Sequence, residues 1–383
     1  MKKLGTISLG IALFTMFFGA GNIVFPLLLG RSVEGNIYPA LIGFILTGVI
    51  VPIIGFVSTM LYEGNYENFF ANIGKIPAKT IIFFCMIIIG ILAASRCVIL
   101  SYASVQPYVP NISLTTYSIF ISFIIFILTF KENLVVKILG RVLGPAKITL
   151  LISILFLVVL NITKIETNEV FPLKSFFKGL GNGYLSLDLI GALFFSHLIY
   201  QSMKGGKLTT KQLIKKGTKV GLFGGLLLAI IYAGFSIVAA LYSKDIANIP
   251  NENLFSALSI KILGNLGGVL ANAAVAIATL TTAMSLITIF ADYLSNDILK
   301  GRLPYTPALI FTILVNLIFE NLKFSGIMMI IEPIALILYP SLIALSIACI
   351  LKKLFNFKYV KTTTFVTFIV TAIGYLLYWT GMF

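Results

Sequence analysis

Apolar and polar positions follow one another in long blocks along this chain. Apolar runs of about 20 residues are separated by short segments that carry charges, prolines, glycines and asparagines. A helix needs about 20 apolar residues to cross a lipid bilayer. The block boundaries predict eleven spanning helices, at residues 4–30, 37–62, 80–106, 114–130, 142–162, 179–202, 218–243, 265–294, 304–320, 325–351 and 362–382. Residues 246–263 are expected to form a short external helix.

The first apolar run is interrupted near its centre by Gly19-Ala20-Gly21-Asn22, with Pro26 four positions further on. Glycine loses the most entropy in a helix and proline lacks an N–H, so the span is expected to break here. We expect the second half-helix to start at about Ile23, with Pro26 in its first turn. Irregular backbone at membrane depth survives where it lines a cavity, which favours a binding site. The alternative is a packing kink between helices.

The sixth run repeats this interruption, with Gly181, Gly183 and Asp188 near its centre. Because helices 1–5 and 6–10 would enter the membrane from opposite sides, they can form inverted repeats, each opening on a broken helix. The predicted fold is therefore an all-α integral membrane protein with a 5+5 inverted repeat. The first repeat covers residues 1–162, the second covers 163–352, and an additional C-terminal helix lies in 353–383.

Composition supports a membrane protein. Hydrophobic residues make up 59% of the 383 residues and charged residues only 11%, which a single soluble core could not accommodate. The net charge of +15 comes from lysines and arginines in short loops, so it sets topology and does not indicate nucleic-acid binding. Their distribution predicts a multi-pass protein of the cell membrane with its N-terminus cytoplasmic and its C-terminus extracellular. The sequence contains no nucleotide-binding GxxxxGK[ST] loop, so a primary pump is not favoured. It also contains no cluster of acids within a span, so a membrane enzyme is not favoured.

The predicted break in the first helix offers two kinds of ligand. N–H groups at the start of the second half-helix suit a carboxylate, while carbonyls at the end of the first, around Thr15 and Phe18, suit a cation. Asn22 has two interpretations: its amide oxygen binds an ion, or the side chain holds the unwound segment together.

Intramembrane charges are candidate functional groups because their desolvation is costly. Asp188 could bind a substrate ammonium or form a structural pair with Arg96, the lone arginine in helix 3. Arg96 could pair with Asp188 or Glu332, or it could snorkel, and a structural role is favoured. Glu332, next to Pro333, is a candidate gating or pairing residue. His197, the only histidine, is interpreted as a packing residue.

Helix 8 carries hydroxyls at Thr281, Thr282 and Ser285, and hydroxyl and carbonyl oxygens are the ligands of hard cations such as sodium. The alternative is hydrogen bonding of these hydroxyls to their own helix. Lys147 in helix 5 has two interpretations as well. Its ammonium could occupy the place of a coupling cation, or it could snorkel to the cytoplasmic surface.

Four motifs together resemble the bacterial branched-chain amino acid:cation symporter family. They are Gly19-Ala20-Gly21-Asn22-Ile23-Val24-Phe25-Pro26, Gly183-Tyr184-Leu185-Ser186-Leu187-Asp188 with Gly191-Ala192-Leu193, Leu280-Thr281-Thr282-Ala283, and Tyr339-Pro340. The resemblance covers nearly the whole chain. That family is similar in turn to the amino acid, polyamine and organocation superfamily, which has the 5+5 inverted repeat.

The resemblance implies a secondary transporter, not an enzyme, that imports leucine, isoleucine or valine by symport with a cation. Sodium is the expected coupling ion, and no organic cofactor is expected. The alternative is a permease of the same fold that is coupled to protons or that transports another amino acid. The partners are the amino acid and the lipid bilayer, with the oligomeric state left open. The implied substrate-binding residues are Ala20, Gly21, Asn22, Ser186 and Asp188, with Tyr102 as a candidate carboxylate partner. The implied sodium ligands are Thr15, Phe18, Ala278, Thr281 and Thr282. The chain departs from the family pattern in its span count, eleven against the usual twelve, and in the charges at Lys147, a candidate coupling residue, and Glu332.

Overall fold

The computed structural model describes residues 5–33, 36–131, 138–145, 147–149, 151–152, 172–204 and 209–380, and its regular elements in these ranges are all helical. Seven stretches of the described chain, each made of one helix or of successive helical segments, are long and apolar enough to cross a membrane. They are α3–η1–α4 (Ile37–Ile45, Leu46–Ile50, Val51–Leu61), α6–η3–α7 (Lys75–Ile87, Ile88–Ala93, Ala94–Val105), α11–α12 (Pro172–Leu185, Asp188–Lys204), α13 (Thr210–Leu241), η5–α14–η6 (Asn251–Asn253, Leu254–Asp292, Tyr293–Ile298), α16 (Lys323–Phe355) and α17 (Val360–Trp379).

An eighth span is formed by α1 (Thr6–Phe17) and α2 (Ala20–Ser32), which meet at an angle of 69°. Two shorter apolar helices, α8 (Leu114–Thr129) and α15 (Tyr305–Glu320), agree with the predicted helices 4 and 9. The predicted helix 142–162 begins near η4 (Leu139–Leu143), and most of it lies outside the described residues. The predicted repeat boundary at residues 162 and 163 also lies outside them.

The helix predicted within residues 246–263 is present from Asn251 to the turn at Gly264. Within α14, Gly264 has φ +68° and ψ −175°, values that only glycine adopts easily, so the chain turns there between two helical parts. Arg31, at the end of α2, donates hydrogen bonds to Ile249 O at 2.7 Å and to Asn251 Oδ1 at 2.8 Å. These hydrogen bonds hold the connection between α13 and α14 against the end of the first broken span.

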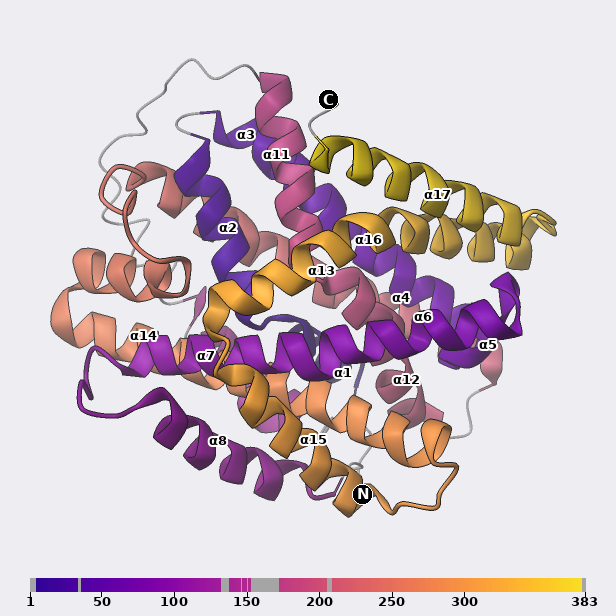
Figure 1. The fold of residues 1–383 in the computed structure, drawn as a ribbon, viewed down its shortest axis with the longest axis horizontal. Coiled ribbons are helices and arrows are strands. Elements are labelled where there is room, and N and C mark those ends of the chain that lie inside the picture. Colours follow the sequence, from indigo (N-terminus) through magenta and orange to yellow (C-terminus); the bar gives the residue numbers. More distant parts are fainter. Residues whose placement is uncertain are drawn as a thin grey trace.

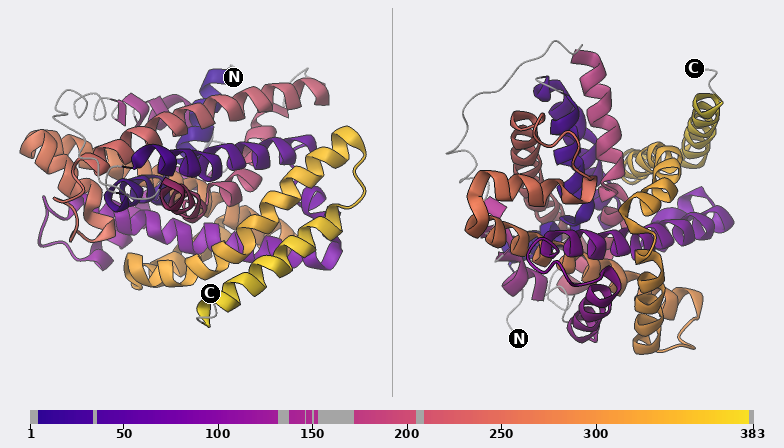
Figure 2. Two further views of the ribbon diagram at one scale, coloured as in Figure 1. Left: turned by 90° about the horizontal axis from the view of Figure 1, so that it is seen from above. Right: turned by 60° about the vertical axis from the view of Figure 1, so that its left-hand side comes forward.

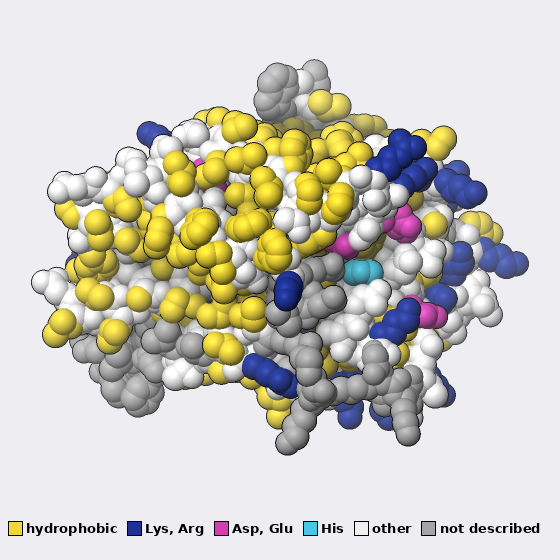
Figure 3. Space-filling view, turned by 90° about the horizontal axis from the view of Figure 1, so that it is seen from below, with side chains coloured by type: hydrophobic (Ala, Val, Ile, Leu, Met, Phe, Trp, Pro, Cys, Tyr) yellow, Lys and Arg dark blue, Asp and Glu magenta, His cyan; other side chains and the backbone are white. Residues whose placement is uncertain are grey.

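The helices pack as a bundle around the two broken spans, with α1 and α2 against α13, α4 against α12, and α7 against α14. Figures 1 and 2 show α17 at the edge of the bundle beside α16. Apolar side chains cover much of the face in Figure 3, while lysines and arginines gather at its right-hand end, where α5 (Tyr66–Phe70) lies in Figure 1. This is the surface expected of a multi-pass membrane protein.

Helices α3 and α11 approach each other backbone to backbone (Figure 1). A Cβ atom on Gly179 would lie 1.9 Å from Ala40 O, and one on Gly43 would lie 2.3 Å from Phe176 O. Only glycine fits at both positions. Thr47 donates a hydrogen bond across the same contact to Leu180 O at 2.9 Å. Small residues that allow such an approach are the usual means by which helices associate in lipid.

Candidate functional site

The first helix breaks where the sequence predicts, at Phe18 and Gly19 between α1 and α2. The second half-helix starts at Ala20, three residues before the predicted Ile23, so the prediction that Pro26 lies in its first turn is wrong. The reason is a local cap: the Asn22 amide oxygen accepts a hydrogen bond from Gly19 N–H at 2.9 Å, which stabilises an earlier start.

The sixth predicted helix breaks at Ser186 and Leu187, between α11 and α12. Leu187 has φ +66°, in the left-handed region that a leucine rarely adopts. Three contacts stabilise this turn. Leu189 N–H donates to Tyr339 Oη at 2.7 Å, and the Ser186 hydroxyl lies 2.7 Å from Gly183 O and 2.8 Å from Asp188 Oδ2. A strained backbone held in this way is typical of a functional site.

A buried hydrogen-bond network joins the two breaks. Asn22 Nδ2 donates to Asp188 Oδ1 at 2.6 Å, and Tyr232 Oη of α13 donates to Asp188 Oδ2 at 2.5 Å. Asn22 Nδ2 also contacts Tyr232 Oη. Because the Asn22 oxygen accepts from Gly19 and its nitrogen serves Asp188, Asn22 holds the unwound segment together in this structure. With Ser186, three donors surround the Asp188 carboxylate and offset part of its desolvation cost.

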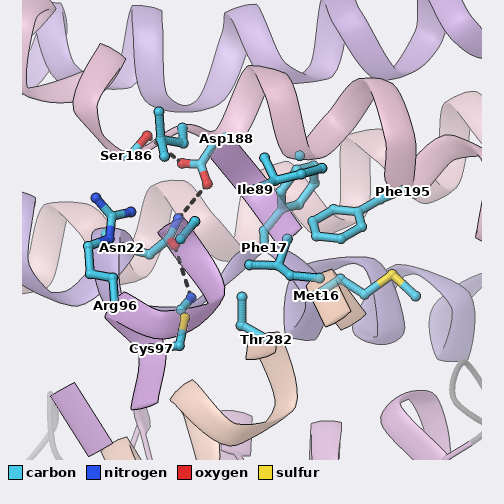
Figure 4. A pocket seen from close by; sticks show the side chains of 17 residues that line it. Met16, Phe17, Asn22, Ile89, Arg96, Cys97, Ser186, Asp188, Phe195 and Thr282 are labelled. Carbon is cyan, nitrogen blue, oxygen red and sulfur yellow. Dashed lines mark hydrogen bonds between the residues drawn. The ribbon is translucent and has the colours of Figure 1, made fainter. Parts of the chain in front are cut away.

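A small cavity of about 30 Å³ lies between the two breaks. Figure 4 shows Asn22, Arg96, Ser186 and Asp188 on one side of it and apolar side chains on the other. The predicted residues that line it are Ala20, Gly21, Asn22, Ser186 and Asp188, and the apolar side includes Met16, Phe17, Ile89 and Phe195. The polar and apolar sides suit the two ends of a small amphipathic molecule, but at about 30 Å³ the cavity holds only a few water molecules and must widen to admit one. Tyr102 is not brought to this cavity, since its hydroxyl donates to Ile112 O at 3.1 Å.

Arg96 lies on α7 with its side chain 2% exposed, and it lines the same cavity. Its Nη1 donates to Leu185 O at 3.3 Å and contacts Met328 Sδ at 3.4 Å. Within the described residues it forms neither of the predicted ion pairs, with Asp188 or with Glu332. Glu332 is exposed on α16 and does not line the cavity.

The residues predicted to bind sodium are brought together, but a lysine nitrogen lies among them. Lys147 Nζ donates to Thr15 O at 3.0 Å, Phe18 O at 2.5 Å, Ala278 O at 3.1 Å and Thr281 Oγ1 at 3.1 Å. Its side chain is fully buried, so the alternative that it snorkels to the surface is wrong for this structure. The carbonyls at the end of α1 form the negative end of the α1 dipole, which stabilises an ammonium.

Thr281 and Thr282 of α14 hydrogen-bond to their own helix and also face this nitrogen or the α1 carbonyls. Thr281 Oγ1 donates to Ala278 O at 2.7 Å and accepts from Lys147, while Thr282 Oγ1 lies 3.2 Å from Thr15 O and 3.4 Å from Ala278 O. The hydroxyls of Thr281 and Thr282 therefore hydrogen-bond within their own helix, as the second interpretation expects, and with the carbonyls of Thr15, Phe18 and Ala278 they form a shell of five oxygens that links α1 to α14.

Sequence reasoning missed Tyr232 and the apolar lining of the cavity. A tyrosine in the middle of a predicted span was a usable signal, because its hydroxyl needs a partner when buried. The apolar lining carried no signal that separates it from other apolar residues. His197 lies away from the cavity, with Nδ1 3.1 Å from Gly64 O and its ring against Tyr66, which agrees with a packing role.

The chain was compared with known proteins. A profile of the family described as "Branched-chain amino acid transport protein" matches residues 2–381. The branched-chain amino acid permease BrnQ of Corynebacterium glutamicum is 27% identical over 365 residues, which covers 92% of this chain and 82% of the permease. The permease BrnQ of Bacillus subtilis is 28% identical over 367 residues with the same coverage.

Solved transporter structures resemble the chain at low identity. MhsT in complex with L-phenylalanine has a TM-score of 0.67 at 16% identity, covering 100% of this chain and 99% of MhsT. Mhp1, a nucleobase-cation-symport-1 family transporter in a closed conformation, has a TM-score of 0.64 at 11% identity, covering 100% of this chain and 94% of Mhp1. A Na⁺-coupled sialic acid symporter has a TM-score of 0.61 at 11% identity, covering 98% and 90%. These likenesses show the fold, that of helical transporters built from inverted repeats.

Proposed function

The chain belongs to the branched-chain amino acid transport protein family, and we propose that it imports leucine, isoleucine or valine across the cell membrane by alternating access. The observation that carries this proposal is the cavity at the two helix breaks, with Asp188 on its polar side and Phe17 and Phe195 on its apolar side. The Asp188 carboxylate would bind the substrate ammonium, and the apolar side would receive a branched aliphatic side chain. N–H groups in the first turn of α2, beginning at Gly21, add donors to the polar side.

The proposed topology has eleven spans, with repeats at 1–162 and 163–352 and a further helix in 353–383. Eight described spans and two shorter apolar helices support it, together with the start of the fifth helix at η4. The gathering of lysines and arginines at one end of the bundle supports a cytoplasmic N-terminus and an extracellular C-terminus (Figure 3).

For the coupling ion, we propose that the Lys147 ammonium takes the place that the resemblance assigns to sodium, so that a proton drives transport. Nζ lies within hydrogen-bond distance of four of the oxygens that a sodium ion would use. A neutral amine has one donor fewer and no charge, so it would hold the carbonyls of Thr15 and Phe18 less strongly. Loss of the proton would therefore loosen α1 from α14, which links protonation to movement at the break.

Sodium at the same oxygens is the second candidate. It is favoured by the shell of five oxygens from Thr15, Phe18, Ala278, Thr281 and Thr282, which is the chemistry of a hard-cation site. The two candidates exclude each other in this geometry, because the ammonium and the ion would occupy one position.

Both parts of the proposal are tested with purified protein in proteoliposomes. Counterflow of labelled leucine, isoleucine and valine, with no counterflow of lysine or glutamate, is expected under any ion condition. Absence of counterflow for all three branched-chain amino acids would overturn the substrate assignment.

Coupling is tested in the same vesicles. An inward proton gradient in sodium-free buffer should drive leucine accumulation. Lys147→Met should keep counterflow and lose this accumulation, while removal of an exposed lysine, Lys211→Met, should change neither. If leucine uptake requires sodium and Lys147→Met stays sodium-dependent, the sodium candidate replaces the proton.

A further inference from the structure

A buried guanidinium in the cavity has donors that no described residue uses. Arg96 Nε is buried without a hydrogen-bond partner, and Nη2 forms no hydrogen bond within the described chain. Only Nη1 is engaged, at 3.3 Å to a carbonyl and 3.4 Å to a thioether sulfur. An arginine is always charged and carries five N–H donors, so it usually finds a carboxylate when it is buried. Arg96 is thus a buried cation that no anionic group of the described chain pairs with.

Asp188 does not supply that anion. Its carboxylate already accepts hydrogen bonds from Asn22, Ser186 and Tyr232, and it lies beyond ion-pair distance of the guanidinium. The Phe25 ring, 5.5 Å from the guanidinium carbon, offers a weaker cation–π contact. Leaving a buried charge without a partner is strongly unfavourable, so the position is best explained by an anion that arrives with the substrate.

Of the two unpaired nitrogens, Nη2 faces the helix break, and Nε is buried behind it. A Cβ atom on Gly21 would lie 2.6 Å from Arg96 Nη2 and 2.8 Å from Ser186 O, so the guanidinium packs directly on the start of α2. Figure 4 shows it on the same side of the cavity as Asn22, Ser186 and Asp188. Nε–H and one Nη2–H form the fork of a guanidinium that matches the two oxygens of a carboxylate. The first N–H groups of α2 lie beside this fork and add backbone donors.

We propose that Arg96 binds the carboxylate of the transported amino acid, together with the first N–H groups of α2. This inference rests on the proposed function and adds the residue that recognises the acid end of the substrate. Arg96 and Asp188 then bind opposite charges of one zwitterion, and the apolar side chains opposite them select its aliphatic part. The site therefore requires both a free carboxylate and a free ammonium on the same small molecule.

The test compares ligands that differ only at the acid end. Displacement of labelled leucine from purified protein is measured with leucine and with leucinamide, which keeps the ammonium and the side chain but has no carboxylate. The parent protein should bind leucinamide at least about 30-fold more weakly, the lower range for truncating one partner of a buried charged hydrogen bond. In Arg96→Gln the affinity for leucine should fall by a similar factor, while the affinity for leucinamide should change little. The variant should therefore bind the two ligands about equally. Arg96→Lys should restore part of the preference for leucine, and Arg302→Gln, at an exposed arginine, should leave it unchanged.

A structural arginine would lower the affinities for both ligands equally, and an unchanged ratio in Arg96→Gln would overturn the inference. If Arg96→Gln does not purify as a monodisperse protein, the inference is tested by the ratio of the affinities for leucine and leucinamide in the parent and in Arg96→Lys. Equal affinity of the parent for leucine and leucinamide would overturn the inference without any variant. Failure of the parent to bind any branched-chain amino acid would instead refute the proposed function.

Discussion

Shortening Lys147 to alanine tests whether the oxygens around its nitrogen form a site for a positive charge. In the parent, four oxygens lie 2.5 to 3.1 Å from Nζ, and Thr282 Oγ1 faces the same carbonyls. Lys147→Ala removes the ammonium and leaves a space lined by oxygens. We expect this variant to bind sodium there and to become sodium-dependent in leucine uptake. The Phe18 oxygen is already close enough, and the other three oxygens must move inward by about 0.5 Å or more to reach the distances that hard cations prefer.

The loss of folding stability caused by Lys147→Ala in the absence of sodium can be worked out from the contacts. Ala278 O still accepts from Thr281, and Thr15 O still accepts from Thr282, so only Phe18 O loses its one donor among the described residues. A buried carbonyl without a partner costs about 1–3 kcal/mol. Sodium at 100 times its dissociation constant would stabilise the folded variant by about 2.7 kcal/mol through mass action. This gain is similar in size to the cost of the unpaired carbonyl.

The assay is thermal unfolding of purified Lys147→Ala in sodium and in choline, followed by leucine uptake in the same two ions. Lys147→Met is the matched control, because its thioether side chain fills the space with weak acceptors and should show no sodium effect. Sodium should raise the unfolding temperature of the alanine variant only. Identical unfolding and uptake of Lys147→Ala in both ions would refute the view that these oxygens are arranged for a cation.

Three further predictions concern the break, the network and the α5 end of the bundle. Gly21→Ala should reduce leucine uptake at least about 10-fold in vesicles, because its Cβ would meet Arg96 Nη2 at 2.6 Å; Gly181→Ala, where no atom lies within 4 Å, should stay active. Tyr232→Phe should weaken leucine binding and destabilise the protein by about 1–3 kcal/mol in denaturation assays, since it removes a donor from the buried Asp188 carboxylate; unchanged stability would mean that this donor is dispensable. Burial and the Asp297 carboxylate raise the pKa of Tyr66 well above its usual value. The unfolded chain would therefore release this proton first, and stability should fall as pH rises past about 10. Tyr66→Phe should flatten that slope in a pH series of unfolding temperatures, and an equally steep slope would contradict the assignment.

The breaks could be predicted because they depend on local chemistry. Glycines and Asn22 weaken the first span wherever the neighbouring helices lie, and the same holds for the glycines before Asp188. The start of α2 was misplaced by three residues because the Asn22 side chain folds back onto Gly19 N–H, and nothing in the sequence separates that cap from ion binding.

The inward position of Lys147 could not be predicted from the sequence. A lysine two turns into a span snorkels or turns inward according to the helices that pack against it, and only the fold brings Thr15 and Ala278 to its nitrogen. The partner of Arg96 could not be predicted from the sequence either. Its sequence position allowed a pair with Asp188, but three other donors occupy that carboxylate, and two of them come from helices distant in sequence.

The backbone-to-backbone contact of α3 with α11 has a mechanical consequence. Helices that meet through side chains can slide by exchanging rotamers, but the contact at Gly43 and Gly179 has no side chains to rearrange. The two helices must therefore travel together as one rigid body during a transport cycle. Bending is then confined to the hinges that the chain already contains, at Phe18–Gly19 and at Ser186–Leu187. The groups proposed to bind the amino acid lie at these hinges, so under that proposal the substrate would sit at the pivot of the movement that carries it.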